Sequence, residues 1–257
     1  MVGKNRIYFL CGNARTFLSC FDSAYENIIS KLFENNNKQN THILFYLKCD
    51  DPGPKGQEYW DFEYEPIDAQ KLKQEIECYE KKYKNITFYS KLLDTNEIED
   101  SKLIGQVKDR TKYVDFLNDD KKLLRALHFN YNIEQCGKII EEIQLENNIE
   151  FDYFIFIRPD LCFTKPCSNI HSYNANKITC SNYPPFGNRY IEKVMNDHIS
   201  IIPKKYMHDF FYSKMHLIKN NITYEFKSSE EIYTHCIRDK YEIKQIGDFS
   251  ILRAMRF

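Results

Sequence analysis

A basic and an acidic residue, Arg158 and Asp160, directly follow a short apolar run at residues 153–157. This run of aromatic and branched side chains is typical of a strand that is buried on both faces. Pro159 has no N–H to donate to a neighbouring strand, so the strand is expected to end there. Because ligands of open α/β sheets bind at the carboxyl ends of the strands, the pair predicts a site for a phosphate-bearing ligand. The alternative is an ordinary surface ion pair.

A tight turn near the start of the chain is the second candidate for anion binding. It consists of Gly12, Asn13, Ala14, Arg15 and Thr16. The turn lies between a predicted strand at residues 6–11 and a helix with an apolar stripe at residues 17–33. Its backbone N–H groups and the helix N-terminus favour an anion, and Arg15 adds a cation, although a solvated surface role for Arg15 stays open. The glycine spacing is not that of a dinucleotide-binding loop.

Strands and helices alternate along the chain in the rhythm of a parallel sheet covered by helices. Strands are predicted at residues 42–48, 85–90, 177–180 and 199–202, with one or two more within 241–257. Helices are predicted at residues 67–83, 120–146, 204–219 and 230–239. A polar stretch at residues 92–119 lacks clear periodicity and predicts a functional flap or an insertion. With no repeat or linker in the sequence, we expect one α/β domain over residues 1–257.

The long predicted helix at residues 120–146 carries both an apolar stripe and polar residues in its middle. His128, Asn130 and Asn132 are the polar residues, which either face a ligand or lie on an ordinary helix surface. The side chains expected to face the core are Leu124, Leu127, Tyr131, Cys136, Ile140 and Ile143.

Composition excludes several classes of protein. A formal net charge of −1 argues against a protein dedicated to nucleic acid or a membrane surface. The N-terminus resembles neither a signal peptide nor a membrane span, so a cytoplasmic location is expected. The nine cysteines form no CxxC pair and are expected to be reduced, without a zinc site. Cys162 and Cys167 flank a turn and are the one pair that could form a local bridge.

Four features occur in an order that resembles a known family. They are the Gly-x-x-Arg-Thr turn, a long helix, the segment ending in Arg158-Pro159-Asp160-Leu161, and Asn196-Asp197-His198 before an apolar strand. The sequence resembles the GT-A glycosyltransferase-like proteins of large DNA viruses and of bacterial surface-polysaccharide loci. The resemblance implies a Rossmann-like, mainly parallel sheet that binds a nucleotide sugar, UDP-linked by preference, and often Mn²⁺ or Mg²⁺. A viral protein would act in the host cytoplasm on a glycan or protein-linked acceptor.

The resemblance also implies roles for individual residues. Gly12, Asn13, Arg15 and Thr16 would lie near the nucleotide. Asp160 would be the last acid of the family's metal-binding Asp-x-Asp motif, but Arg158 stands where the first acid would be. Arg158 could therefore neutralise the diphosphate itself.

Glycosyl transfer by inversion needs a carboxylate base to take the proton of the acceptor hydroxyl. Asp197 is the first candidate, and Glu230 or Glu231 is the second. His198 is expected to touch the metal or a phosphate. Two rivals remain. One is a non-catalytic nucleotide-sugar or glycan-binding module. The other is a metal-dependent nuclease, because Pro159-Asp160 and Glu242-Ile243-Lys244 imitate its motif.

Overall fold

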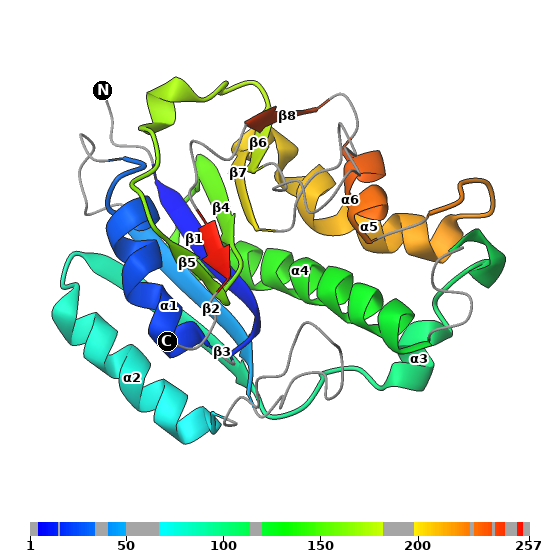
Figure 1. Cartoon of the computed structure of the whole chain (residues 1–257), viewed down its shortest axis with the longest axis horizontal. Coiled ribbons are helices and arrows are strands. Elements are labelled where there is room, and N and C mark those ends of the chain that lie inside the picture. The colour runs from blue at the N-terminus through cyan, green and yellow to red at the C-terminus, as the bar shows by residue number, and fades with distance from the viewer. Residues whose placement is uncertain are drawn as a thin grey trace.

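In the computed structural model, a seven-stranded mixed sheet is built from the described part of the chain, with helices on both faces (Figure 1). The structure describes residues 5–14, 16–33, 41–49, 67–113, 120–181, 198–226, 229–237, 240–244 and 251–253. The strand order is β3-β2-β1-β4-β7-β6-β8. A separate two-stranded sheet pairs β5 with β9.

Four parallel strands form the first half of the sheet, as the sequence predicts. They are β1 (Arg6–Asn13), β2 (Thr41–Lys48), β3 (Ile86–Leu93) and β4 (Tyr153–Ile157). β1 pairs in parallel with both β2 and β4, and β2 pairs in parallel with β3. All five residues of β4 are buried, which confirms the predicted central strand. The sequence prediction of a mainly parallel α/β sheet is therefore confirmed.

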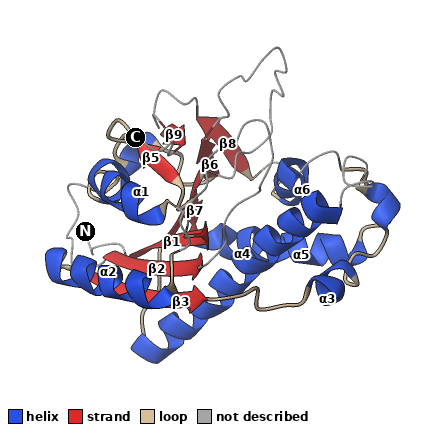
Figure 2. Ribbon diagram, turned by 60° about the horizontal axis from the view of Figure 1, so that its bottom comes forward, coloured by secondary structure: helices blue, strands red, loops and turns tan. Residues whose placement is uncertain are grey.

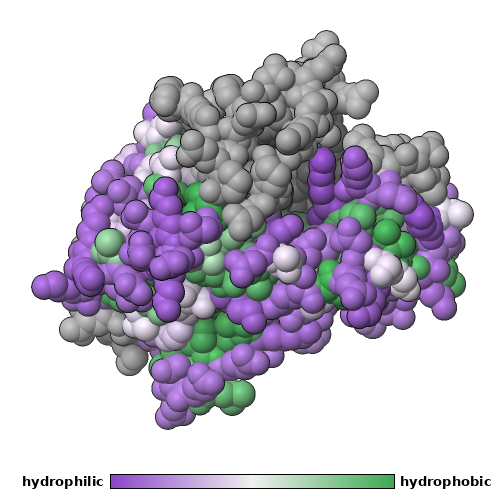
Figure 3. Space-filling model, turned by 90° about the horizontal axis from the view of Figure 1, so that it is seen from below, coloured by the Kyte–Doolittle hydropathy of each residue, from purple (hydrophilic) through white to green (hydrophobic). Residues whose placement is uncertain are grey.

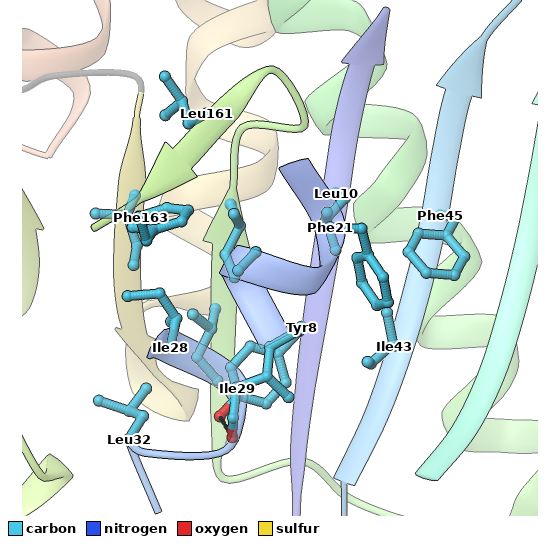
Figure 4. Close-up of a cluster of buried hydrophobic side chains, with 14 of the residues drawn as sticks. Tyr8, Leu10, Phe21, Ile28, Ile29, Leu32, Ile43, Phe45, Leu161 and Phe163 are labelled. Carbon is cyan, nitrogen blue, oxygen red and sulfur yellow. Dashed lines mark hydrogen bonds between the residues drawn. The ribbon is translucent and has the colours of Figure 1, made fainter. Parts of the chain in front are cut away.

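The first face of the sheet is covered by α1 (Phe17–Ala24) and α2 (Ala69–Lys82). Side chains alternate along each strand, so Tyr8, Leu10, Ile43 and Phe45 point to this face. They pack against Phe21 of α1 and against the residues that follow α1, as Figure 4 shows. Asp68 caps α2 by accepting a hydrogen bond from the backbone N–H of Lys71 at 2.7 Å.

The predicted helix at residues 17–33 is only partly regular. α1 ends at Ala24, and a π-helical turn (Tyr25–Ile29) follows. This wider turn still buries Ile28 and Ile29, and it lets the side chain of Asn27 donate to the carbonyl oxygen of Phe163 at 2.7 Å. The apolar stripe was therefore predicted correctly, while the helix type was set by a tertiary contact.

The second face is covered by α4 (Asp120–Asn147) and α5 (Met207–Asn220), the latter entered through a 3₁₀ turn (Lys204–Tyr206). Phe9 and Phe156 of the sheet meet Phe210 and Phe211 of α5, with ring centroids of Phe9 and Phe211 5.0 Å apart. One expectation is corrected here. Leu123 is buried on α4, whereas Leu124 is only partly buried, because the helix turns Leu123 and Leu127 toward the same packed face.

The stretch predicted as a flap or insertion is partly helical. It contains α3 (Asp100–Ile104) and a 3₁₀ turn (Arg110–Lys112), while residues 114–119 lie outside the described residues. Leu103 and Tyr113 are buried there against α4, α5 and α6 (Ser229–Cys236), in a third hydrophobic cluster. These elements are too short for periodicity to appear in the sequence. Residues 92 and 93 end β3, and the other described residues of this stretch form an insertion that packs on α4, α5 and α6 in a shared cluster.

The second half of the sheet mixes strand directions. It contains β7 (Ile199–Pro203), β6 (Ile178–Ser181) and β8 (Tyr241–Lys244). β7 runs antiparallel to β4 and to β6, while β6 and β8 are parallel. β5 (Leu161–Phe163) leaves the sheet, pairs with β9 (Ile251–Arg253) and lies against α1; a short 3₁₀ turn (Ile170–Ser172) follows it.

The strands lie between two layers of helices, as the turned view shows, with α1 and α2 on one side and α4, α5 and α6 on the other (Figure 2). On the face seen from below, hydrophilic residues cover most of the described surface, and hydrophobic atoms gather in small separate areas (Figure 3). Within the residues that the structure describes, none of the helices combines the length and the apolar character needed to cross a membrane.

Candidate functional site

The order of the strands reverses between β1 and β4. After β1 the chain builds β2 and β3 on one side, and it then returns to place β4 on the other side of β1. Open α/β sheets bind ligands at the carboxyl edge beside such a reversal. Both candidate segments of the sequence, at the end of β1 and at the Arg158–Asp160 strand end, lie at this reversal.

Gly12 allows the two loops to approach each other closely. Its φ of +148° lies in the region that favours glycine. A Cβ atom at this position would lie 3.3 Å from Cγ of Pro159, which is tighter than an ordinary contact. The missing side chain thus brings the end of β1 against the turn after β4. Gly12 and Asn13 were predicted in a turn, but both belong to β1, because the strand stays paired with β2 as far as Asn13.

Arg158 and Asp160 form a two-pronged ion pair at the end of β4. Nε of Arg158 donates to Oδ1 of Asp160 at 2.6 Å, and Nη2 donates to Oδ2 at 3.0 Å. The two side chains are 23% and 21% exposed, so the pair is partly screened from water and yet accessible. Such a fork fixes the plane of the guanidinium group, and the carboxylate that it binds here is that of Asp160. The structure thus contains the ion pair that the sequence left open as the alternative, and a phosphate ligand stays a prediction.

β7 brings His198 to the same strand end. Because β7 runs antiparallel to β4, its first residue Ile199 pairs with Ile157, the last residue of β4. The backbone N–H of Arg158 donates to the carbonyl oxygen of His198 at 2.9 Å. His198 is buried, with 6% of its surface exposed. The structure thus brings the backbone of His198 to that of Arg158, although the two residues are 40 positions apart in the sequence.

The remaining predicted site residues are described only in part. Asn13 ends β1, and the carbonyl oxygen of Thr16 accepts the first backbone bonds of α1 from Ser19 and Cys20. Arg15 and Asp197 lie outside the described residues. Glu230 lies in the first turn of α6, which packs against α5, but its side chain is not described.

Two cysteines beside this site are in contact, although the sequence did not predict that they meet. The thiol of Cys162 lies 3.4 Å from that of Cys20, across 142 residues of sequence. Burial raises the pKa of Cys20 above the ordinary range, and the neighbouring Cys162 thiol and Asp160 carboxylate add to the shift. Cys167, which the sequence offered only as a possible bridge to Cys162, instead points its thiol at the carbonyl oxygen of Ile28, 3.8 Å away. No local sequence signal links Cys20 to Cys162.

Two of the three polar residues in the middle of α4 have side-chain partners within the fold. The side chain of Asn130 is buried and donates to the carbonyl oxygen of Ala126 at 2.8 Å, within its own helix. Nε2 of His128 lies 2.7 Å from a carboxylate oxygen of Asp100, and so ties α4 to α3. These contacts give both residues a structural role.

Among the residues that the structure describes, no group of three or more His, Cys, Asp or Glu side chains could hold a metal ion. Both oxygens of Asp160, the predicted metal ligand, already accept hydrogen bonds from Arg158. The described side chains at this edge therefore do not by themselves make a metal site around Asp160. A cation there would have to use the remaining lone pairs of a carboxylate that Arg158 already neutralises.

Solved structures with a similar fold are glycosyltransferases. An active-site mutant of LgtC superposes with a TM-score of 0.51 and 10% identity, over 94% of this chain and 73% of that chain. This chain has the GT-A fold. GlyE of Streptococcus pneumoniae TIGR4 matches at 11% identity and a TM-score of 0.43, over 95% of this chain. This chain spans only 46% of GlyE.

A glycosyltransferase involved in glycosylation of the major capsid of PBCV-1 also matches, at 14% identity and a TM-score of 0.37, over 69% of this chain and 77% of that one. No family model matches the sequence. The comparison with curated proteins gives no significant match either. The GT-A fold therefore rests on structure alone.

The GT-A sheet keeps the two halves of the nuclease-like motif apart. In the register of the sheet, Glu242 of β8 pairs with Thr179 of β6. Thr179 pairs with Ile201 of β7, and Ile201 pairs with Ile155 of β4. Three strand spacings thus separate Glu242 from β4, roughly 14 Å. Asp160 lies further along the chain, in the turn beyond the end of β4. Glu242 instead accepts hydrogen bonds from the Thr179 hydroxyl and from a backbone N–H. This geometry argues against the nuclease alternative.

Proposed function

We propose that this protein is a glycosyltransferase that moves a sugar from a nucleotide-sugar donor, UDP-linked by preference, to a glycan or protein-linked acceptor. The observation that carries the proposal is the carboxyl edge between β1 and β4, where Gly12 meets Pro159 beside the Arg158–Asp160 fork. The GT-A fold, shared with LgtC, supports the same reaction class. We place the reaction in the cytoplasm, as the sequence suggests.

We propose that Arg158 supplies the charge that meets the donor diphosphate. Negative charge grows on the phosphate oxygens as the nucleoside diphosphate leaves, so a fixed cation at that point stabilises the transition state. Asp160 would hold the guanidinium plane in place. The sequence prediction that Asp160 binds Mn²⁺ or Mg²⁺ stays a prediction, which the response of the unmodified protein to Mn²⁺ tests.

Two further groups are assigned from the sequence. We propose that Arg15 contacts the phosphates from the turn after β1. If the reaction inverts the anomeric centre, Asp197, which adjoins His198 in the sequence, would be the carboxylate base, with Glu230 as the second candidate. Asp197 would then reach the strand end where His198 accepts from the Arg158 backbone.

The decisive experiment is calorimetric titration of UDP and UDP-sugars with and without Mn²⁺. Arg158→Ala should weaken nucleotide binding by about 1.5–3 kcal/mol, as for a charged hydrogen bond. Arg158→Lys should lose much of the same affinity, because lysine keeps the charge but not the fork. Unchanged affinity in both variants would rule out the assigned role.

A matched control exists elsewhere in the chain. Arg110 also pairs with an aspartate, Asp120, which is the first residue of α4. Arg110→Ala should leave nucleotide affinity unchanged. Tighter nucleotide binding with Mn²⁺ that Asp160→Asn abolishes would instead assign the charge to a metal ion held by Asp160.

A non-catalytic nucleotide-sugar or glycan-binding module remains the second candidate, because Arg158 stands where the resembling family has an acid. Turnover separates the two. A glycosyltransferase should release UDP from its donor in the presence of an acceptor, and more slowly by hydrolysis in its absence. Tight, specific donor binding with no UDP release across an acceptor panel would favour the binding module.

A further inference from the structure

We propose that Cys20 and Cys162 form an oxidation site, at which a peroxide-class oxidant converts the two thiols into a disulfide that links α1 to β5. The two sulfur atoms lie 3.4 Å apart, in van der Waals contact. A disulfide needs about 2.05 Å between them, so a shift of little more than 1 Å completes the bond.

The two thiols differ in access to solvent, which gives each a distinct part in the reaction. Cys20 is buried with 1% of its surface exposed, on the inner side of α1. Cys162 is only partly buried, at the middle of the short strand β5. The oxidant therefore reaches Cys162 first, and Cys20 acts as the resolving thiol.

The reaction balances in two steps. The sulfur of Cys162 attacks one peroxide oxygen; the O–O bond breaks, and Cys162 becomes a sulfenic acid as one water leaves with the thiol proton. The sulfur of Cys20 then attacks the sulfur of Cys162. The S–O bond breaks, and the hydroxyl leaves as a second water with the proton of Cys20. Two thiols are oxidised by two electrons in total, and one peroxide is reduced to two waters.

The surroundings hold the two elements together before any bond forms. The Ser23 hydroxyl accepts from the backbone N–H of Phe163 at 3.1 Å, and Asn27 donates to the carbonyl oxygen of Phe163 at 2.7 Å. Leu161 and Phe163, on either side of Cys162, are buried in the same cluster as Phe21 (Figure 4). β5 is thus docked on α1 with the two thiols already facing each other.

A second thiol contact supplies an internal control. Cys11 and Cys136 interact in the interior, where both are fully buried. Peroxide has no access to them in the folded protein. Of the two thiol contacts, only the one with a partly exposed member should therefore oxidise.

The test uses the full chain with Cys78→Ser, which removes an exposed thiol. After treatment with a small excess of hydrogen peroxide, thiol titration of the denatured protein should show the loss of two thiols per molecule. Peptide mapping under non-reducing conditions should find Cys20 linked to Cys162. A reductant should restore both thiols.

Further variants in the same background decide the assignment. Cys162→Ser should abolish the linked peptide and the loss of two thiols, whereas Cys167→Ser should keep both. A bridge between Cys162 and Cys167, a Cys162 that proceeds to sulfinic acid while Cys20 stays reduced, or oxidation of Cys11 and Cys136 instead would each overturn the proposal.

Discussion

Single residues set the geometry where the end of β1 meets the turn after β4. Gly12 adopts a φ of +148°, and its missing Cβ leaves room for Pro159. Pro159 in turn ends β4, so that Arg158 and Asp160 meet across one turn. The closeness of the two loops thus depends on one residue without a side chain facing one residue with a rigid ring.

Gly12→Ala should reduce the free energy of unfolding by about 1–3 kcal/mol, because alanine is strained at this φ. Its Cβ would also press on the Pro159 ring. Nucleotide affinity should fall as well, if the donor binds beside Gly12. Urea denaturation measures the first effect. Gly105→Ala is the control for backbone strain, since Gly105 has ordinary helical angles, with φ −60° and ψ −15°. An added Cβ there would also lie 3.3 Å from a neighbouring atom, the carbonyl oxygen of Ser101, so a smaller loss of stability than for Gly12→Ala isolates the strain.

Protonation of His42 should destabilise the fold in mild acid. Burial lowers the pKa of His42, and the charge of Arg6 lowers it further. The unfolded chain therefore binds a proton more readily than the folded chain, and stability falls as the pH drops below about 6.5. His42→Gln should flatten the loss of stability between pH 7.5 and pH 5.5 in denaturant titrations.

Tyr89→Phe tests the cause of that pH dependence. The hydroxyl of Tyr89 lies 3.3 Å from Nδ1 of His42. Its removal should lower stability slightly at every pH and preserve the slope, because the imidazole still titrates. A wild-type slope in the His42→Gln variant would contradict the assignment.

At the scale of elements, α4 and α5 pack unusually close where they cover the second face of the sheet. Gly137 of α4 faces the side chain of Phe211, and an added Cβ would lie only 2.7 Å from Cβ of Phe211. Phe211 itself packs on Phe9 and Phe154 of the sheet, so it has little freedom to move away. Close approach of the helices therefore depends on Gly137.

Gly137→Ala should destabilise the protein by about 1–3 kcal/mol through overpacking. This loss should outweigh the better helix propensity of alanine, worth ~1 kcal/mol. Thermal and denaturant unfolding measure the effect. Lys138→Ala on the neighbouring exposed face should stay within ~0.5 kcal/mol. An equally stable Gly137→Ala variant would mean that the two helices separate easily.

For the whole molecule, the hydrophobic clusters share elements, which argues for one cooperative unit. The sheet carries the first cluster on one face and the second on the other, because side chains alternate along each strand. α4 then joins the second cluster, through Cys136 and Ile140, to the third, through Leu123 and Leu127. The insertion therefore packs on a helix, α4, that also covers the sheet.

We predict that residues 1–257 unfold in a single cooperative transition, as expected for one domain. Far-ultraviolet circular dichroism and tyrosine fluorescence should give the same midpoint in urea. Ile140→Ala should lower the midpoints of both probes together, since it removes apolar contacts from the shared helix, at a cost of about 2–5 kcal/mol. Two separate transitions would show that the insertion folds on its own.

The sequence by itself predicted the elements whose signals are local. The apolar runs of β1, β2 and β4 and the stripe of α2 follow from periodicity alone, and all were found. The Arg158–Asp160 pair could also be predicted from the sequence, because the two residues are two positions apart and directly follow a buried strand. The shorter helices of the insertion and the π-helical turn after α1 lacked such a signal.

Only the tertiary structure decided which distant segments meet. His198 lies beside Arg158 because β7 runs antiparallel to β4, and Cys20 faces Cys162 because β5 leaves the sheet and docks on α1. The sequence had instead suggested Cys167 as the partner of Cys162. Strand direction and register are set by how whole faces pack and by which edges remain to be paired, and no local pattern of residues records them.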